Sequence, residues 1–327
     1  MGQPSLSHHA GRVRGGRKAL GTLAGLSLLL LAACSNPQDR APLITAPGRT
    51  VKLPAGPLTE ASGLAPSLLR PDALWLNNDS GDAPLLYQVS MDGRELGRLR
   101  IEGATATDWE DCASFTYKGQ PWLLAADTGD NDQQRDILTL WIAPEPEPSK
   151  LSPGKPLKVG LAWSVRVRFP DGPEDCESVG VDATEERIYL VTKRSHPPVV
   201  YCVPLKPAGD GVVVAQRVTA LEWMKPSSGL GSTLPTPRGR YANQPTGISF
   251  SPDGRLAVIL TYVDTWLYTR APGQSWAELF SKPGVLMPDH GLQQAEAACL
   301  SADAHSVFIT SEGAEPPLLR YRLTPRP

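Results

Sequence analysis

The chain repeats one pattern of short strands five times, and this repeat constrains the fold more than any other feature. Each repeat opens with a polar residue and a short apolar strand, at 62–65, 110–113, 177–180, 246–249 and 296–299. A turn leads to a second strand, at 73–76, 121–124, 187–191, 256–260 and 306–309. A loop then leads to a third strand, at 85–87, 138–141, 199–201, 266–268 and 318–321. Repetition of such strand-rich units is typical of a β-propeller.

A fourth strand is expected in four of the repeats, at 96–101, 161–169, 212–218 and 276–280. Gly, Pro and Asp bound the strands, and no long stretch has the 3.6-residue period of an amphipathic helix. We therefore predict an all-β propeller with four-stranded blades. The fifth repeat has no fourth strand of its own, and the segment 50–53 is expected to supply it. That pairing would close the ring and remove its free sheet edges.

The number of blades follows from the number of repeat openings, which gives five. The second and third repeats are longer than the others, so a six-bladed ring stays open as an alternative. We place the extra residues in a loop instead, because 225–243 is rich in Gly, Pro and Ser and has no strand pattern.

The first residues of the chain have the layout of an export signal. Four basic residues, Arg12, Arg14, Arg17 and Lys18, precede the apolar stretch 19–33, which is too short to span a bilayer comfortably. The sequence Leu-Ala-Ala-Cys that ends at Cys34 resembles the bacterial lipobox, which implies cleavage before Cys34 and lipidation of that cysteine. An ordinary signal peptide with an incidental cysteine is the alternative. Ser35, where an inner-membrane retention signal would have Asp, favours the outer membrane of a bacterial cell envelope.

This interpretation divides the chain into a lipoprotein signal peptide at 1–33, a lipidated flexible tether at 34–49 and a β-propeller domain at 50–327. The tether is small, polar and Pro-rich. Without the four basic residues of the leader, 28 basic and 34 acidic residues remain, a net charge of −6. A nucleic-acid partner is therefore not expected. The expected partners are the membrane, reached through the lipid, and a protein or small-molecule ligand.

Four short phrases carry a resemblance to a known group of proteins. They are Asp-Trp-Glu-Asp at 108–111, Asn-Asp-Ser-Gly at 78–81, Asp-Thr-Gly-Asp-Asn at 127–131 and Thr-Ser-Glu-Gly at 310–313. The chain thereby resembles secreted bacterial WD40-like or TolB-like propeller proteins. This resemblance implies the fold over the whole mature domain but no particular reaction. The chain departs from true WD40 repeats, because it lacks their Gly-His and Trp-Asp signatures.

In a propeller the first residue of every repeat reaches the same end of the central channel. These residues are Glu110, Glu177, Glu296, Ser62 and Thr246. Carboxylates so close together take up protons or bind a cation. Oxygen ligands suit Ca²⁺ better than Zn²⁺, for which clustered His or Cys is absent. We expect a structural calcium ion, a hydrated and hydrogen-bonded ring, or a catalytic ion. Calcium-dependent nucleotidases of the apyrase kind arrange Glu and Ser around their channel in a similar way.

The loops after the second strands should lie at the same end of the channel and contribute ligand contacts. The candidate ligand-binding residues are Asp79, Asp82, Trp109, Asp127, Asp130, Asn131, Lys193 and Arg194. Asp and Asn are also common turn formers, so plain turns are the alternative. The two basic residues would meet a phosphate or carboxylate, or balance the acidic ring.

Two classes of function agree with these residues. The first is an envelope-anchored binding or interaction platform, and the second is a calcium-dependent phosphohydrolase, apyrase-like or phytase-like. No Gly-x-Ser-x-Gly elbow is present, and of the histidines only His196 lies in a loop near the predicted site. Because no general base can be assigned and the catalytic residues stay unknown, the platform is favoured.

Four cysteines, Cys112, Cys176, Cys202 and Cys299, remain after Cys34. An oxidising compartment permits three pairings of the four, and sequence does not choose among them. The expected position of Cys112 and Cys176 near the channel ends of adjacent blades favours that pair slightly, with four free buried thiols as the alternative.

Overall fold

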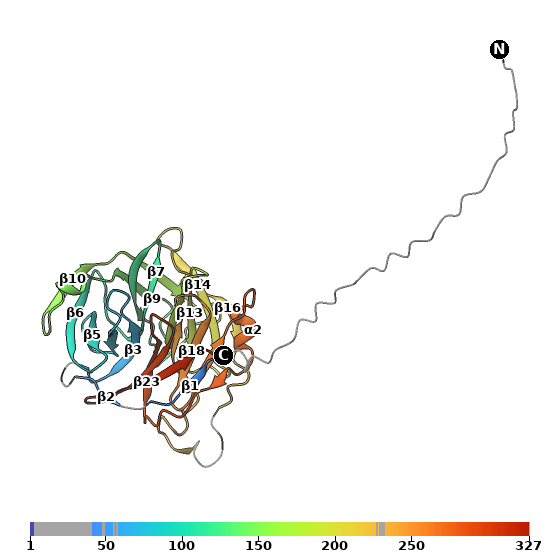
Figure 1. Cartoon of the computed structure of the whole chain (residues 1–327). Coiled ribbons are helices and arrows are strands. Elements are labelled where there is room, and N and C mark those ends of the chain that lie inside the picture. Colours follow the sequence, from blue (N-terminus) through green and yellow to red (C-terminus); the bar gives the residue numbers. More distant parts are fainter. Residues whose placement is uncertain are drawn as a thin grey trace, which may run out of the picture. The chain divides into compact units, whose positions relative to one another are not determined.

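The computed structural model describes residues 1–2, 41–47, 50–54, 56, 58–226, 228 and 233–326. Five sheets form the blades of a β-propeller, as predicted (Figure 1). Blade 1 consists of β3 (Ala61–Pro66), β4 (Ala73–Asn78), β5 (Leu85–Ser90) and β6 (Glu95–Glu102). Blade 2 consists of β7 (Trp109–Tyr117), β8 (Gln120–Asp127), β9 (Leu138–Pro144) and β11 (Trp163–Arg168).

The remaining three blades follow in chain order. Blade 3 consists of β12 (Cys176–Asp182), β13 (Arg187–Thr192), β14 (Val199–Pro204) and β16 (Gln216–Ala220). Blade 4 consists of β17 (Pro245–Phe250), β18 (Leu256–Thr261), β19 (Thr265–Thr269) and β20 (Val285–Leu286). Blade 5 consists of β21 (Ala295–Leu300), β22 (Ser306–Ser311) and β23 (Pro317–Thr324). All predicted first, second and third strands are confirmed.

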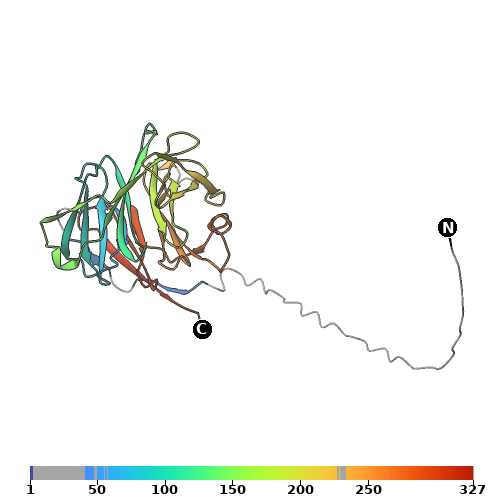
Figure 2. The same ribbon diagram turned by 90° about the horizontal axis from the view of Figure 1, so that it is seen from above.

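An N-terminal segment closes the ring. β1 (Leu43–Thr45) and β2 (Val51–Lys52) both pair antiparallel with β23, the outer strand of blade 5. Figures 1 and 2 show these short strands beside the last strand of the chain. The innermost strands pack against one another in order, and β21 of blade 5 packs against β3 of blade 1. The predicted closure at 50–53 is thus confirmed, and β1 adds a second contact within the stretch expected to be a tether.

The long second and third repeats each contain a crossing strand, and the third also contains a long loop. β10 (Pro156–Gly160), which follows the short 3₁₀ helix η1 (Pro148–Lys150), leaves blade 2 and pairs in parallel with β6 of blade 1. β15 (Val212–Val214) leaves blade 3 and pairs in parallel with β11 of blade 2. Each covers the outer edge of the preceding blade, which would otherwise present unpaired backbone groups. In the third repeat the extra residues lie mainly in the predicted loop, because no described residue between the end of β16 at Ala220 and the start of β17 at Pro245 belongs to a strand. The five sheets show that the six-bladed alternative is wrong.

Two predicted fourth strands need correction. Residues 276–280 form the helix α2 (Trp276–Phe280), not a strand. Ser275 caps the helix by accepting the backbone N–H of Glu278 at 3.2 Å, and Trp276, Leu279 and Phe280 face the core at helical spacing. The fourth strand of blade 4 is instead the two-residue β20. In blade 3 the predicted strand at 212–218 divides into the crossing strand β15 and the fourth strand β16.

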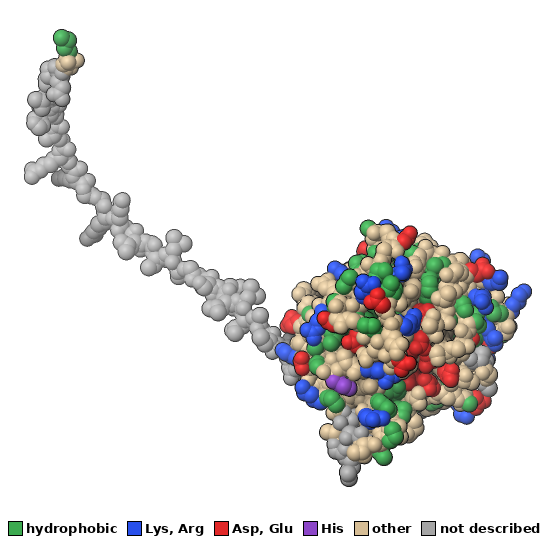
Figure 3. Space-filling model, turned by 180° about the vertical axis from the view of Figure 1, so that it is seen from behind, with side chains coloured by type: hydrophobic (Ala, Val, Ile, Leu, Met, Phe, Trp, Pro, Cys, Tyr) green, Lys and Arg blue, Asp and Glu red, His purple; other side chains and the backbone are tan. Residues whose placement is uncertain are grey.

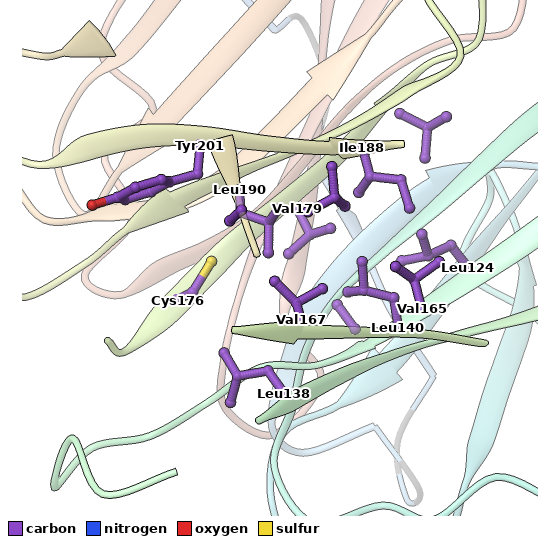
Figure 4. Packing of buried hydrophobic residues seen from close by; sticks show 14 of the residues in the cluster. Leu124, Leu138, Leu140, Val165, Val167, Cys176, Val179, Ile188, Leu190 and Tyr201 are labelled. Atoms are coloured by element: carbon purple, nitrogen blue, oxygen red, sulfur yellow. The ribbon is translucent and has the colours of Figure 1, made fainter. Parts of the chain in front are cut away.

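The core consists of five apolar clusters, one between each pair of neighbouring blades. Figure 4 shows the cluster between blades 2 and 3, in which Leu124, Leu140 and Val165 meet Val179 and Leu190. The inner strands β4, β12 and β21 are buried along their whole length. The outer strands β6, β11 and β23 instead alternate buried and exposed residues over much of their length.

The four cysteines are buried and free. The preference for a Cys112–Cys176 disulfide is therefore wrong. Cys112 packs between blades 1 and 2, with its thiol 3.7 Å from the carbonyl oxygen of Trp75. Cys176 packs between blades 2 and 3, with its thiol 3.6 Å from the carbonyl oxygen of Ser178.

The predicted signal peptide at 1–33 lies almost wholly outside the described residues, as does Cys34. Among the residues that are described, no helix has the length and apolar character needed to cross a membrane.

Candidate cation site at the channel mouth

Each innermost strand carries a β-bulge near its first residue, and this bulge builds the ring predicted from sequence. The pairing register shifts between Ala61 and Gly63 in β3, and the same shift recurs in the other four blades. The residues skipped by the five shifts are Ser62, Glu110, Glu177, Thr246 and Glu296. A bulge re-aims one side chain out of the regular alternation. All five side chains are buried.

Glu110 is the least satisfied member of this bulge ring. Its Oε2 accepts a hydrogen bond from the Ser62 hydroxyl at 3.2 Å. Its Oε1 is fully buried and has no hydrogen-bond partner among the described residues. Burial, followed by the nearby charges of Glu177 and Asp79, raises the pKa of Glu110 well above its ordinary value. A buried carboxylate oxygen without a donor indicates a site for a proton or a cation.

The opposite side of the bulge ring has its own positive charge. Lys193, at the loop after β13, forms an ion pair with Glu177, and its ammonium lies 5.1 Å from the ring centre of Tyr262. Burial alone would lower the pKa of Lys193, but Glu177 and Glu296 outweigh it and hold the pKa well above its ordinary value. Lys193 therefore stays protonated and neutralises this side.

Two further carboxylates join Glu110 on the side away from Lys193. Carboxylate oxygens of Asp79, Asp108 and Glu110 lie within 4.8 Å of one another. A cation with metal–oxygen distances of about 2.3–2.6 Å fits between such oxygens. Burial and then the Asp79 carboxylate raise the pKa of Asp108 to about 7. No described Lys or Arg forms an ion pair with any of these three carboxylates.

A glycine allows this arrangement. Gly129 lies directly over the carboxylates, and a Cβ atom there would collide with Glu110 Oε1 and Asp108 Oδ2. Its N–H donates to the carbonyl oxygen of Asp108 at 3.2 Å, which holds the loop in place. The loop after β8 thus lies in close contact with the carboxylates of Glu110 and Asp108.

A second group of carboxylates, formed by Glu110, Asp175 and Glu177, is equally compact. Its other two members, however, are already paired with cations. Arg194 Nε lies 2.6 Å from Asp175 Oδ2, and Lys193 forms an ion pair with Glu177. The group of Asp79, Asp108 and Glu110, called the cation cluster below, is therefore the better candidate.

Sequence reasoning missed Asp108 and Asp175 as site residues. Each lies two residues before a ring glutamate, so that Asp-x-Glu occurs at 108–110 and again at 175–177. The corresponding position in blade 5 is Gln294, which donates to Glu296 Oε1 at 3.3 Å. A polar residue two positions before each ring glutamate is therefore the sequence signal that could have identified these site residues. Glu312, in the loop after β22, is a further acidic neighbour, and burial with Glu296 and Asp79 raises its pKa to about 7.

The predicted ligand-binding residues of blade 2 build turns in this structure. Asp127 accepts the N–H groups of Thr107 and Asp108 and pairs with Arg135 at 2.8 Å. Asp130 accepts the N–H groups of Gln134 and Arg135 at 2.9 and 2.7 Å.

The other candidates have mixed outcomes. Asp82 accepts hydrogen bonds from Asn78 at 2.9 Å and from the Tyr87 hydroxyl at 2.7 Å. It therefore links β4 and β5 within blade 1. Asn131 is exposed and accepts a hydrogen bond from Arg194. Trp109 is 2% exposed, packs between blades 1 and 2 and donates from Nε1 to the carbonyl oxygen of Thr105 at 2.9 Å. In this structure its ring has no open face for stacking on a ligand.

Asp111 lies deeper in the channel than the bulge ring and ties the blades together. Its two oxygens accept the N–H groups of Cys112 at 2.8 Å and of Val179 at 2.9 Å. Burial raises its pKa well above the ordinary value, and backbone hydrogen bonds from blades 1 to 4 oppose that shift. This residue is structural, because its oxygens are satisfied by the innermost strands.

Acidic side chains also gather at the surface of the domain (Figure 3). Figure 3 shows acidic side chains gathered together on one face of the domain, with Lys and Arg side chains around them.

Comparisons with known proteins identify no family for this chain. No family model matches the chain, and no curated protein matches it in sequence. The solved structure of the PQQ-bound aldose sugar dehydrogenase from Streptomyces coelicolor has 12% identity and a TM-score of 0.42, covering 86% of this chain and 99% of that one. The nidogen/laminin complex has 13% identity and a TM-score of 0.43, covering 82% and 84%. The five blades are given by the sheets of this chain itself, and no family is shown for it.

Proposed function

We propose that this protein is a lipid-anchored propeller of a bacterial envelope, whose channel mouth binds one calcium ion and serves as a binding platform for a protein or small ligand. The anchor is supported by the basic residues, the apolar stretch and the lipobox-like sequence ending at Cys34. Several acyl chains on such a cysteine hold a protein stably, because each buried methylene contributes about 0.8 kcal/mol. The outer membrane is the proposed location, because Ser35 follows the cysteine.

One observation carries the calcium proposal. Glu110 Oε1 is buried without a partner, beside the carboxylates of Asp79 and Asp108. Three negative charges in so small a space are stabilised by a divalent cation or by protons. Calcium suits the oxygens because it accepts six to eight ligands in flexible geometry, and backbone carbonyls or water complete its shell.

The ion would join two blades. Asp79 belongs to the loop after β4 in blade 1, whereas Asp108 and Glu110 belong to the start of β7 in blade 2. A bound cation therefore fixes the rim loops of these blades relative to each other. Ordered rim loops favour ligand binding, because the loops then lose less conformational entropy when a ligand binds.

The hydrolase alternative gains less support from the same geometry. A phosphate substrate needs cationic groups free to contact it. Lys193 and Arg194, the nearest candidates, are paired with Glu177 and Asp175. Turnover of nucleotides and phytate with and without calcium separates the two classes.

The calcium proposal is tested by thermal unfolding in chelator and in calcium. Calcium at about a hundred times its dissociation constant should stabilise the domain by about 2.7 kcal/mol. At the same calcium concentration, Asp108→Asn should reduce that increment to about half or less. In chelator it should melt at or above the wild-type temperature, because it removes carboxylate repulsion. Identical melting curves of the wild type in chelator and in calcium would defeat the proposal.

The anchor is tested separately by fractionation of cells. The wild-type protein should accumulate in the membrane fraction with lipid attached, and Cys34→Ala should carry no lipid. Lipid labelling that persists in Cys34→Ala would contradict the assignment of Cys34.

A further inference from the structure

The path of the N-terminal segment fixes the face at which the anchored end reaches the propeller. Leu43 pairs with Thr324 at the end of β23, and Val51 pairs with Leu318 near its start. The N-terminal segment therefore runs along blade 5 from the end of β23 toward the channel mouth. β23 ends beside the turn between β21 and β22, where the N–H of Leu323 donates to the carbonyl oxygen of His305 at 2.8 Å. This turn lies at the end of the blade opposite the bulge ring.

A groove lies where the N-terminal segment arrives. Its volume is about 830 Å³, and residues of blades 4 and 5 line it together with Pro42 and the C-terminal segment. Arg326 reaches across to the N-terminal segment and donates from Nε to the carbonyl oxygen of Ala41 at 2.9 Å. The groove thus adjoins Ala41 and Pro42, which lie within the predicted tether and are the first described residues after position 2.

The groove offers cationic groups without carboxylate partners. These groups are the exposed side chains of Arg255 and Arg326, and the exposed His305 also lines the groove. No carboxylate of the described residues forms an ion pair with Arg255 or Arg326. Arg270 also lines the groove, but its guanidinium group is engaged. Its Nη2 lies 2.9 Å from Asp182 Oδ2, and its Cζ lies 4.4 Å from the ring centre of Trp276.

The two acidic residues of the groove are engaged in their own turns. Asp253 Oδ1 accepts the Ser251 hydroxyl at 2.6 Å and the N–H of Arg255 at 3.1 Å. Asp303 Oδ1 accepts the Ser301 hydroxyl at 2.5 Å and the N–H of His305 at 3.0 Å. Each carboxylate is thus held in its turn through one oxygen, and neither forms an ion pair with the guanidinium group of Arg255 or Arg326.

We propose that this groove faces the anchoring membrane and binds the phosphate of an anionic phospholipid headgroup through Arg255 and Arg326. The inference rests on the lipid anchor of the proposed function. Cys34 precedes Ala41 by seven residues, and seven residues span at most about 25 Å. The groove is therefore within reach of the headgroups, and the channel mouth with its cation cluster points away from the membrane. Arginine suits this role because its planar guanidinium matches phosphate geometry.

The test uses the lipidated full-length protein in vesicles that contain a lipid-borne fluorescence quencher. Because Cys112, Cys176, Cys202 and Cys299 are buried, a fluorophore can be attached selectively to one new exposed cysteine. His305→Cys reports on the groove, and Asn131→Cys reports on the opposite, channel-mouth face. In vesicles of phosphatidylglycerol and phosphatidylcholine, the label at 305 should be quenched strongly and the label at 131 little.

The arginines are tested in the His305→Cys background. Each arginine near an anionic surface contributes roughly a fivefold increase in membrane association. Arg255→Gln with Arg326→Gln should therefore reduce quenching toward the level found in phosphatidylcholine alone. The control pair Arg100→Gln and Arg166→Gln removes the same charge from the exposed faces of β6 and β11 and should leave quenching unchanged.

Two results would overturn the inference, and they differ in what else they affect. Equal quenching of the two labels, or equal effects of the two arginine pairs, would contradict the orientation and the groove while the anchor stands. A wild-type protein that separates from phosphatidylcholine vesicles on washing would contradict the anchor itself and the orientation with it.

Discussion

Lys193 forms an ion pair with Glu177 inside the bulge ring, and both side chains are only 7% exposed. The ammonium thus occupies the side of the channel mouth formed by blades 3 to 5. The cation cluster of Asp79, Asp108 and Glu110 occupies the side formed by blades 1 and 2. The mouth therefore has a built-in cation on one side and a position for a bound cation on the other.

Replacement of the built-in cation should be costly. Lys193→Met leaves Glu177 and Glu296 buried without a counter-charge, and breaking a buried ion pair costs about 3–5 kcal/mol. Urea unfolding measures this loss. Lys158→Met removes a lysine from an exposed ion pair with Glu102 and should cost less than about 1 kcal/mol. A similar loss in both variants would show that Lys193 does not neutralise the ring.

Gly129→Ala should weaken calcium binding without removing a ligand. Its Cβ would collide with Glu110 Oε1 and Asp108 Oδ2 and displace both carboxylates. Changes that disturb the orientation of metal ligands typically cost about 10–100-fold in affinity. Gly160→Ala is the control, because a Cβ at Gly160 meets no atom within 4 Å. Calcium titrations that give the same affinity for both variants would contradict the proposed position of the ion.

The stability of the calcium-free protein should fall as the pH rises. The pKa of Asp108 is raised to about 7 by burial and Asp79, and that of Glu312 to about 7 by burial and Glu296. In the unfolded chain such groups titrate near about pH 4. The folded state therefore binds more protons between these values, so this contribution is complete below about pH 4 and is lost as the pH rises through about 7.

Melting temperatures in chelator at several pH values measure this slope. Calcium should remove the loss, because the ion replaces the protons as the counter-charge. Asp108→Asn should flatten the slope in chelator, because its side chain carries no proton to lose. A stability in chelator that rises steadily from about pH 5 to about pH 8 in the wild type, with the same slope in Asp108→Asn, would contradict the raised pKa of Asp108.

Asp111 should contribute to the stability of the whole ring. Asp111→Ala leaves the N–H groups of Cys112 and Val179 buried without their acceptor, at about 1–3 kcal/mol each. Asp111→Asn retains one acceptor oxygen and should lose less. Chemical denaturation of both variants checks the order. An alanine variant as stable as the wild type would show that the channel hydrogen bonds do not hold the blades together.

The sequence predicted the ring of strands because each blade repeats the same order of apolar strands and turns. It also identified Glu110, Glu177 and Glu296 as neighbours, because equivalent positions of a closed ring converge. The pattern did not reveal the bulges that aim these side chains, because a bulge changes the register without changing composition.

Other features depended on long-range contacts that a local pattern does not contain. Residues 276–280 looked like a strand because five residues show too little of either period, and the Ser275 cap together with burial of Trp276 favours the helix. The crossing strands β10 and β15 pair with neighbouring blades, which spacing along the chain does not indicate. The burial of Lys193 and the position of Asp108 became visible only once the loops after the second strands were placed.

Isothermal titration of calcium into the chelator-treated protein tests the central claim most directly. We predict one ion per chain in the wild type and in Glu296→Gln, whose residue lies on the Lys193 side. Asp108→Asn and Glu110→Gln should bind calcium at least about tenfold more weakly. The exposed control Glu102→Gln should match the wild type. Loss of binding in Glu296→Gln with full binding in Asp108→Asn would contradict the cation cluster, and absence of binding in the wild type would contradict the calcium site altogether.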